Sequence, residues 1–180
     1  MFSGLSNDNG KRREAFIPDS VVTISGGELL YKGPTASHAF GRLSGEVVGV
    51  DVEEETRRIC VNLITPSGMK VQMALPDEGG QTLRVLLPLA TAGRFSGRTM
   101  NIDVAPERKD GEVRAAIKVY DGNRPLEWKL LKNDRPATKE GWSALARKIA
   151  RDIQGVIEKE WSDRAIPRVA PDIDDVPEGL

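Results

Sequence analysis

Alternation of apolar and polar side chains between residues 58 and 75 is the feature that most restricts what this chain can fold into. The run RRICVNLIT places Ile59, Val61 and Leu63 against Arg58, Cys60 and Asn62. The run MKVQMAL then places Met69, Val71, Met73 and Leu75 on one side and Lys70 and Gln72 on the other. Because successive side chains of a strand point to opposite faces, each run predicts a half-buried β-strand, and PSG at 66–68 predicts the turn between them.

A glycine-punctuated strand is expected just before this pair. In GRLSGEVVGVDVE, Val48, Val50 and Val52 alternate and are predicted to share one face. The glycines at 45 and 49 allow the strong bending that a small barrel requires. Nearer the N-terminus, SVVTI and ELLYKG predict a short strand or hairpin around the glycine pair at 26–27.

The hydrophobic period changes after residue 80. Leu83, Leu86 and Leu87 have helical spacing and Gly93 closes the segment, so one helix is predicted over residues 81–92. Pro88 removes a backbone hydrogen-bond donor, which predicts a kink or two shorter helical pieces.

Strand patterns return after this helix. RTMNIDVAP directs Met100, Ile102 and Val104 inward, and VRAAIKVY alternates Val113, Ala115, Ile117 and Val119 against Arg114, Ala116, Lys118 and Tyr120. DGN at 121–123 predicts a hairpin turn, with RPLEWKLL as the returning strand. The apolar run from Trp142 to Trp161 then keeps helical spacing, with Thr138 as its N-cap. This helix is expected either to pack against the strands, which is the simpler interpretation, or to form a partner or self-association surface.

Four regions follow from these patterns: a flexible N-terminal arm (1–18), a β domain (19–135), a C-terminal helix (136–165) and an acidic tail (166–180). The tail ends in PDIDDVPEGL, which buries too little apolar surface to offset the entropy cost of ordering, so disorder is expected. No apolar run approaches the roughly 18 residues of a membrane span, and the first residues lack the apolar stretch of a secretory signal. A soluble cytoplasmic protein is therefore expected.

The chain has a single cysteine, Cys60, and a single histidine, His38. Neither an intrachain disulfide nor a Cys/His zinc site can be assembled from them, and no metal or cofactor is expected. Cys60 is expected to be a buried thiol and His38 a loop residue. The motifs GxxxxGKS/T, GxGxxG, HExxH and GxSxG are absent, so an enzyme is not expected.

Charge is unevenly distributed along the sequence. The net charge is −1, but residues 166–180 set Arg168 against four acidic residues and carry −3, which leaves +2 on residues 1–165. Binding to a phosphate backbone depends on local positive patches rather than on total charge, so nucleic acid is not excluded as a partner.

Three strands, a helix and a two-stranded hairpin follow one another over about 90 residues, which is the chain order of a five-stranded OB barrel with its helix between strands 3 and 4. In layout, residues 40–132 followed by the acidic tail resemble phage-type and bacterial single-stranded-DNA-binding proteins. The resemblance rests on FGRLSGEVVGVDVE, LRVLLPLATAG, DVAPERKDGEVRAAIKVYDGNRPLEWK and DIDDVPEGL. It covers about half the chain plus the tail, and it implies a mainly β, OB-like barrel with an appended C-terminal helix.

A protein that binds single strands needs cations along a groove and flat side chains on which bases stack, each stacked base contributing about 1–3 kcal/mol. Alternation places Arg114, Lys118 and Tyr120 on one face of a single strand. The candidate nucleic-acid-binding residues are Arg42, Arg58, Lys70, Arg98, Arg114, Lys118, Tyr120 and Trp128. The competing interpretation is that these residues form only the solvated half of an amphipathic sheet, with Trp128 packed into the core.

The resemblance implies a sequence-nonspecific single-stranded-DNA-binding protein that acts in replication, recombination or repair in a bacterium or a phage-infected cell. The acidic tail residues, Asp172, Asp174, Asp175 and Glu178, would serve autoregulation or the recruitment of replication and recombination proteins. Homo-oligomers are compatible with this function, and a membrane partner is not expected. The alternative is a structural or adaptor OB-fold protein of a virus particle or protein complex, in which the tail only adds solubility.

Removal of residues 170–180 deletes these four carboxylates and no basic residue, which changes the net charge from −1 to +3. Affinity for single-stranded DNA should rise several-fold at low salt, because a mobile polyanion that competes for the cationic groove is lost. The two proteins should converge near about 0.3 M salt, where the Debye length is about 5–6 Å. Fluorescence anisotropy with a labelled oligo-dT measures the effect. A large fall in melting temperature would show instead that the tail is docked structure.

Overall fold

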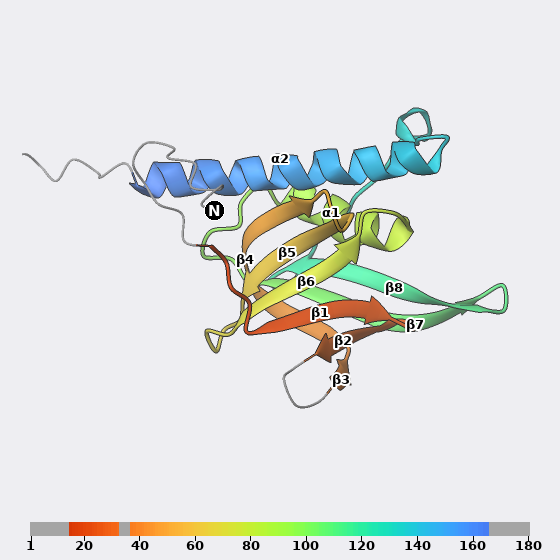
Figure 1. Ribbon diagram of the computed structural model, residues 1–180, viewed down its shortest axis with the longest axis horizontal. Helices are drawn as coiled ribbons and strands as arrows, with labels where there is room; N and C mark the ends of the chain where they lie inside the picture. The colour runs from red at the N-terminus through yellow and green to blue at the C-terminus, as the bar shows by residue number, and fades with distance from the viewer. Residues whose placement is uncertain (1–14, 33–36, 166–180) are drawn as a thin grey trace, which may run out of the picture.

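The computed structural model describes residues 15–32 and 37–165, and in these ranges the protein is mainly β (Figure 1). One mixed sheet holds nine strands, and two α-helices cover it. The elements are β1 (Ser20–Ser25), β2 (Glu28–Lys32), β3 (Ser37–Phe40), β4 (Arg42–Glu53), β5 (Arg58–Ile64), β6 (Lys70–Pro76), α1 (Gly80–Ala92), β7 (Met100–Lys109), β8 (Glu112–Asp121), β9 (Arg124–Pro125), the 3-10 turn η1 (Lys132–Asp134) and α2 (Lys139–Ala165). Within those ranges, neither helix has the length and apolarity needed to cross a membrane.

Strand β4 bends at Gly45 and so joins the two halves of the sheet. Its first four residues pair with β7, and the residues from Glu46 onward pair with β5. A Cβ atom at Gly45 would lie 2.8 Å from the carbonyl oxygen of Ile64. The crossing point, where β4 changes its partner from β7 to β5, therefore requires glycine. One of the two glycines expected to bend this strand thus stands where its pairing partner changes.

A register shift between Val47 and Gly49 corrects the predicted face of β4. A β-bulge adds one residue to a strand and so reverses which side chains point inward beyond it. Val47, 2 % exposed, therefore takes the inward position predicted for Val48. Val50, also 2 % exposed, and Val52, partly buried against the core, keep the predicted face.

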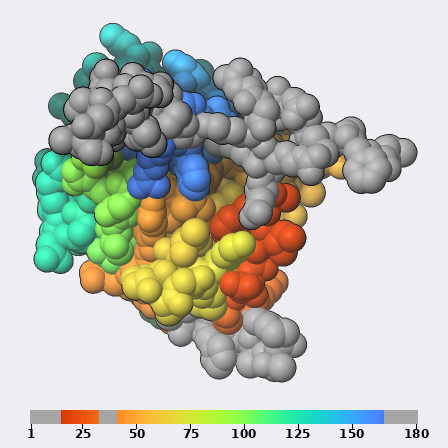
Figure 2. Space-filling view, turned by 90° about the vertical axis from the view of Figure 1, so that its left-hand side faces the viewer, coloured from red at the N-terminus to blue at the C-terminus, as the bar shows by residue number. Residues whose placement is uncertain are grey.

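The predicted closed five-stranded barrel is wrong, although α1 does lie between the third and fourth of those strands as expected. The sheet order is β3-β2-β1-β6-β5-β4-β7-β8-β9, so β6 pairs with β1, in parallel, instead of closing onto β8. Figure 2 shows the N-terminal strand (red) against β6 (yellow). The outer edge of β8 meets α1, from which Arg84 donates a 3.1 Å hydrogen bond to the carbonyl oxygen of Ala115. Both edges that would close the barrel are thus occupied.

The curved sheet brings its two halves together at the β1–β2 turn. Gly27, at φ +80°, packs so closely on β7 that an added Cβ would lie 2.6 Å from the Cα of Pro106. Pro106 has no N–H to offer a further strand, which protects this edge of β7. The expected hairpin around residues 26–27 is confirmed, with β1 and β2 antiparallel. His38 lies in β3, paired with Tyr31, rather than in the expected loop.

The β7–β8 hairpin extends beyond the rest of the sheet (Figure 1). Asp110 and Gly111 have φ of 53° and 78°, the geometry of a two-residue turn that matches strand twist. Val113, predicted to face inward, is 51 % exposed. It pairs with Arg108 of β7, but the pairing of β4 with β7 does not extend beyond Asp103, so in the described ranges no third strand accompanies the hairpin here. The predicted returning strand is also too long: β9 has only two residues, and it ends at Pro125, which lacks a backbone donor.

Both predicted helices are confirmed, with small differences. Helix α1 ends at Ala92 and is capped by Gly93, whose φ of 67° is left-handed. It is one helix through Pro88, and not the two shorter pieces that the proline suggested. Helix α2 follows Thr138, whose hydroxyl accepts a hydrogen bond from the N–H of Gly141. The α2 residues buried in the common core are Ala146, Ile149, Ala150, Ile153 and Ile157, so this helix packs on the sheet as the simpler interpretation expected. Trp161, at the end of the same stripe, is 51 % exposed.

Cys60 is a buried thiol, as predicted. Burial, followed by the nearby carboxylate of Glu53, raises the pKa of this thiol to about 12. The thiolate, which is the reactive form, is therefore scarce in the folded protein near neutral pH.

Two glycine-to-alanine substitutions should shift stability in opposite directions. Gly45→Ala places a methyl group against the Ile64 carbonyl and should lower the free energy of unfolding by about 1–3 kcal/mol. Gly155→Ala, in the exposed middle of α2 with no atom in the way, should raise it by about 0.5–1 kcal/mol. Urea denaturation monitored by circular dichroism measures both. Equal effects would contradict the role of Gly45 as the crossing point.

Candidate nucleic-acid interface

Three of the predicted residues meet on the polar face of β4, β7 and β8. Cross-strand register aligns Arg42 of β4 with Asp103 of β7, and Asp103 with Lys118 of β8. The next row aligns Ser44, Asn101 and Tyr120 in the same way. Side chains directly opposite one another in a sheet have Cβ atoms about 4.5–5.5 Å apart, so these two rows form one continuous surface.

Arg42 is held on this surface by a forked contact with Asp103. Its Nε and Nη2 atoms donate to the two carboxylate oxygens at 2.5 and 2.8 Å. These hydrogen bonds raise the pKa of the Arg42 guanidinium, because they favour its charged form. The guanidinium carbon also lies 5.9 Å from the ring centroid of Tyr120, within the range of a cation–π contact. One predicted cation is thus shared between a carboxylate and an aromatic ring.

Two open hollows meet at Lys118 and Tyr120, which line both. The first, of about 570 Å³, lies between β8, α1 and the segment 125–129; its other lining residues are Pro88, Ile117, Val119, Pro125, Leu126, Glu127, Trp128 and Lys129. The second, of about 670 Å³, lies over β4, β7 and β8, and is also lined by Gly41, Arg42, Asp103, Val104, Ala105 and Ala116. Lys118 and Tyr120 are therefore the centre of the surface.

Trp128 reaches the first hollow because the chain continues alongside β8 after β9 ends. The N–H of Leu126 donates to the carbonyl oxygen of Val119 at 2.9 Å, and the Leu126 side chain is buried. Trp128 itself is 40 % exposed, so it does not pack into the core as the competing interpretation held. Two aromatic rings, Tyr120 and Trp128, and two lysines, Lys118 and Lys129, line one open hollow.

Arg114 and Arg98 lie at the two ends of this surface. Arg114 is four residues from Lys118 along β8, opposite Glu107 of β7. Arg98 precedes β7 and contacts Asp121 at 3.0 Å, a carboxylate that also lies 3.4 Å from Arg124. Both arginines are near the face, but each is paired with an acidic side chain.

The structure does not bring Arg58 and Lys70 to this surface. They lie on the adjacent strands β5 and β6 but at opposite ends, where Arg58 pairs with Pro76 and Lys70 with Ile64. In the sheet order, β5, β4 and β7 separate Lys70 from β8. The four acidic tail residues, Asp172, Asp174, Asp175 and Glu178, fall outside the described ranges.

Ion pairing divides the predicted cations into two groups. All four predicted arginines have a carboxylate within 4 Å; the pairs are Arg42–Asp103, Arg58–Glu53, Arg98–Asp121 and Arg114–Glu112. Lys118 is exposed and has no ion pair with any residue of the described ranges. Of the predicted cations on the central surface, Lys118 is therefore the one without an ion pair in the described ranges.

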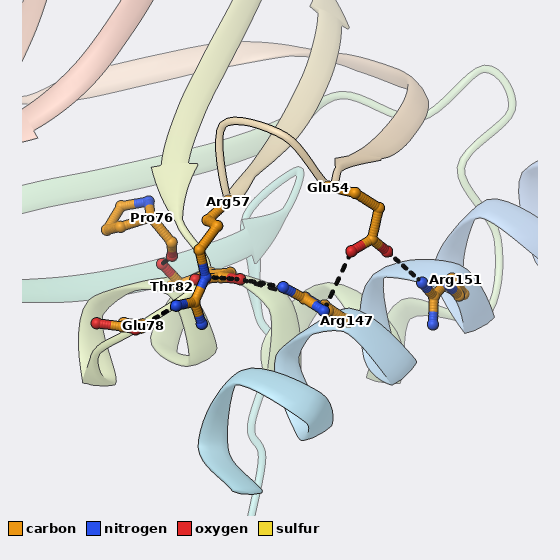
Figure 3. A network of polar contacts seen from close by, with 8 residues as sticks. Glu54, Arg57, Pro76, Glu78, Thr82, Arg147 and Arg151 are labelled. Atoms are coloured by element: carbon orange, nitrogen blue, oxygen red, sulfur yellow. Dashed lines mark hydrogen bonds and ion pairs between the residues drawn. The ribbon is translucent and has the colours of Figure 1, made fainter. Parts of the chain in front are cut away.

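A second charged cluster joins α2 to the β4–β5 turn and is structural (Figure 3). The Asp77 side chain, 2 % exposed, accepts hydrogen bonds from Arg147 of α2 at 2.7 Å and from Arg57 at 3.4 Å. Arg147 also contacts Glu54 at 3.2 Å, and Glu54 contacts Arg151 at 2.9 Å. These pairs tie α2 to the β4–β5 turn and to the segment before α1. Over the ranges described, no group of three or more His, Cys, Asp or Glu side chains is arranged to hold a metal ion.

Sequence reasoning missed the acidic member of the central surface, Asp103, and the hollow formed by residues 125–129. Alternation placed Asp103 on the polar face, but only the register of β7 with β4 and β8 sets it between Arg42 and Lys118. The proline in RPLEWKLL was the available signal that the strand would end early and free Trp128 from pairing.

Comparison with known proteins gives no relative: no protein-family model, no curated protein and no solved structure matches the chain.

Asp77→Ala should destabilise the protein by about 2–4 kcal/mol, because it leaves a partly buried arginine without its closest carboxylate. The neighbouring change Glu78→Ala is the matched control. Glu78 is 54 % exposed and its contact with Arg57, at 3.1 Å, should contribute less than about 1 kcal/mol. Thermal unfolding followed by circular dichroism compares the two. A loss no larger for Asp77→Ala than for Glu78→Ala would contradict the anchoring role.

Proposed function

We propose that this protein binds single-stranded DNA without strong sequence preference, through the surface centred on Lys118 and Tyr120. The observation that carries the proposal is an exposed lysine, without an ion pair in the described ranges, near a tyrosine on the same strand face, with the exposed ring of Trp128 lining the same open hollow. Phosphates would be neutralised by Lys118 and Lys129, and bases would stack on the two rings.

The shape of the surface supports a flexible, single-stranded ligand. Both hollows are open, they share Lys118 and Tyr120, and the Trp128 ring lines the first of them. A stacked duplex keeps its bases inside the helix, whereas a single strand can turn them outward onto aromatic side chains. Stacking is tolerant of sequence because every base has a flat face.

The arrangement of strands fits the same proposal at the level of the fold. Strands β4 to β8 with α1 keep the chain order of an OB barrel, and we regard them as an opened variant of it into which the β1–β2 hairpin is inserted. The remaining parts of the proposal are a role in replication, recombination or repair in a bacterial or phage-infected cytoplasm, and an acidic tail that regulates binding or recruits partner proteins.

Lys118→Ala should weaken binding of a labelled oligo-dT several-fold at low salt and make the slope of log K against log salt less negative by about 0.7, the value of one phosphate contact on a single strand. Tyr120→Ala and Trp128→Ala should each cost about 1–3 kcal/mol of binding free energy through lost stacking. Fluorescence anisotropy at several salt concentrations measures all three.

The matched control is Lys70→Ala, which removes the same charge from an exposed strand position on β6, separated from β8 by three strands. Its affinity should equal that of the wild type. If Lys118→Ala and Lys70→Ala weaken binding equally, the surface is wrong and only net charge matters. If the wild type does not bind at about 20 mM salt, where electrostatic binding is strongest, the structural or adaptor role is favoured instead.

A further inference from the structure

The carboxylate of Asp103 occupies the position on the Lys118–Tyr120 surface where a phosphate would be expected to bind. It stands directly between two cations, with Arg42 on the neighbouring strand to one side and Lys118 on the other. Its side chain is 31 % exposed, and both oxygens accept hydrogen bonds from Arg42.

The forked contact matters because it uses the geometry that arginine also offers to phosphate. A guanidinium binds carboxylates and phosphates through two parallel N–H donors. In this protein the Nε and Nη2 donors of Arg42 are already satisfied, although 56 % of the arginine side chain is exposed. An incoming phosphate must therefore displace Asp103 or bind without the paired Nε and Nη2 donors of Arg42.

Asp103 also weakens phosphate binding at Lys118, its neighbour on β8. Lys118 is paired with it across the β7–β8 register but has no ion-pair contact with it or with any other described residue. A phosphate that approaches Lys118 consequently approaches a carboxylate as well, which repels it. Asp103 thus opposes phosphate binding at both cations.

We propose that Asp103 is a resident competitor for phosphate, which keeps Arg42 out of the binding site and limits affinity for single strands. This inference rests on the proposed function, because it concerns the same surface. The carboxylate keeps binding weak and easily reversed by salt, and its loss turns Arg42 into a further phosphate contact.

The test is the substitution Asp103→Asn in the full chain, measured with labelled oligo-dT by fluorescence anisotropy across a salt series. Asp103→Asn should bind several-fold more tightly at low salt, and its slope of log K against log salt should be more negative by about 0.7, since one phosphate contact is gained. Adding Arg42→Ala should return the salt slope to the wild-type value and remove the part of the affinity gain that the released guanidinium supplies, leaving only the part due to relieved repulsion at Lys118. Asp103→Thr, which suits a strand, should reproduce the result if the amide perturbs folding.

Glu53→Gln is the matched control. It removes the same charge and releases Arg58, whose guanidinium lies 3.5 Å from the Glu53 carboxylate. Arg58 is on β5, outside the Lys118–Tyr120 surface. Its affinity and salt slope should stay at the wild-type values. An equal gain in Glu53→Gln would reduce the effect to net charge and overturn the inference.

The remaining outcomes separate this inference from the proposed function. If the wild type binds and Asp103→Asn has the same or lower affinity and the same slope, the inference fails and the proposed function stands. If only Asp103→Asn binds, the inference stands and the proposed function of the wild type fails. If neither protein binds, both fail.

Discussion

The bend of β4 at Gly45 is the constraint on which the rest of the structure depends. A Cβ atom at this position would lie 2.8 Å from the carbonyl oxygen of Ile64, so only a residue without a side chain fits there. Because β4 changes its partner at this point, its first four residues pair with β7 and the residues from Glu46 onward pair with β5. The same crossing sets Arg42 beside Asp103 and so begins the row that continues to Lys118. Backbone geometry at a glycine therefore determines which charges meet on the candidate surface.

The surface itself shows how a nearly neutral protein can present a local cation. Its arginines are matched by nearby carboxylates, and the exposed pairs among them, such as Arg114–Glu112, contribute little to stability. Lys118 is left without such a partner in the described ranges, next to the tyrosine and beside the hollow that Trp128 enters. Net charge over the whole chain, −1, carries almost no information about this arrangement.

Local patterns predicted the elements of this fold better than their assembly. The strands around Val61 and Val71 and both helices follow from periodicity, because burial of one face dictates it. The bulge beside Val48 is not encoded by alternation, and it moved Val47 into the core instead. Pairing of β6 with β1 depends on contacts far apart in the sequence, so the open sheet could not be distinguished from a closed barrel. Register, likewise, is what brings Asp103 into the site and leaves Arg58 and Lys70 outside it.

The most direct test of the central claim is an NMR titration of the ¹⁵N-labelled protein with unlabelled oligo-dT at low salt. The account predicts that amide shifts change along residues 101–103, 116–120 and 126–129, which contribute side chains to the two hollows or lie beside them. Little change should occur along β5 and β6, where Arg58 and Lys70 lie. Changes confined to β5 and β6, or spectra that do not respond to DNA, would contradict it.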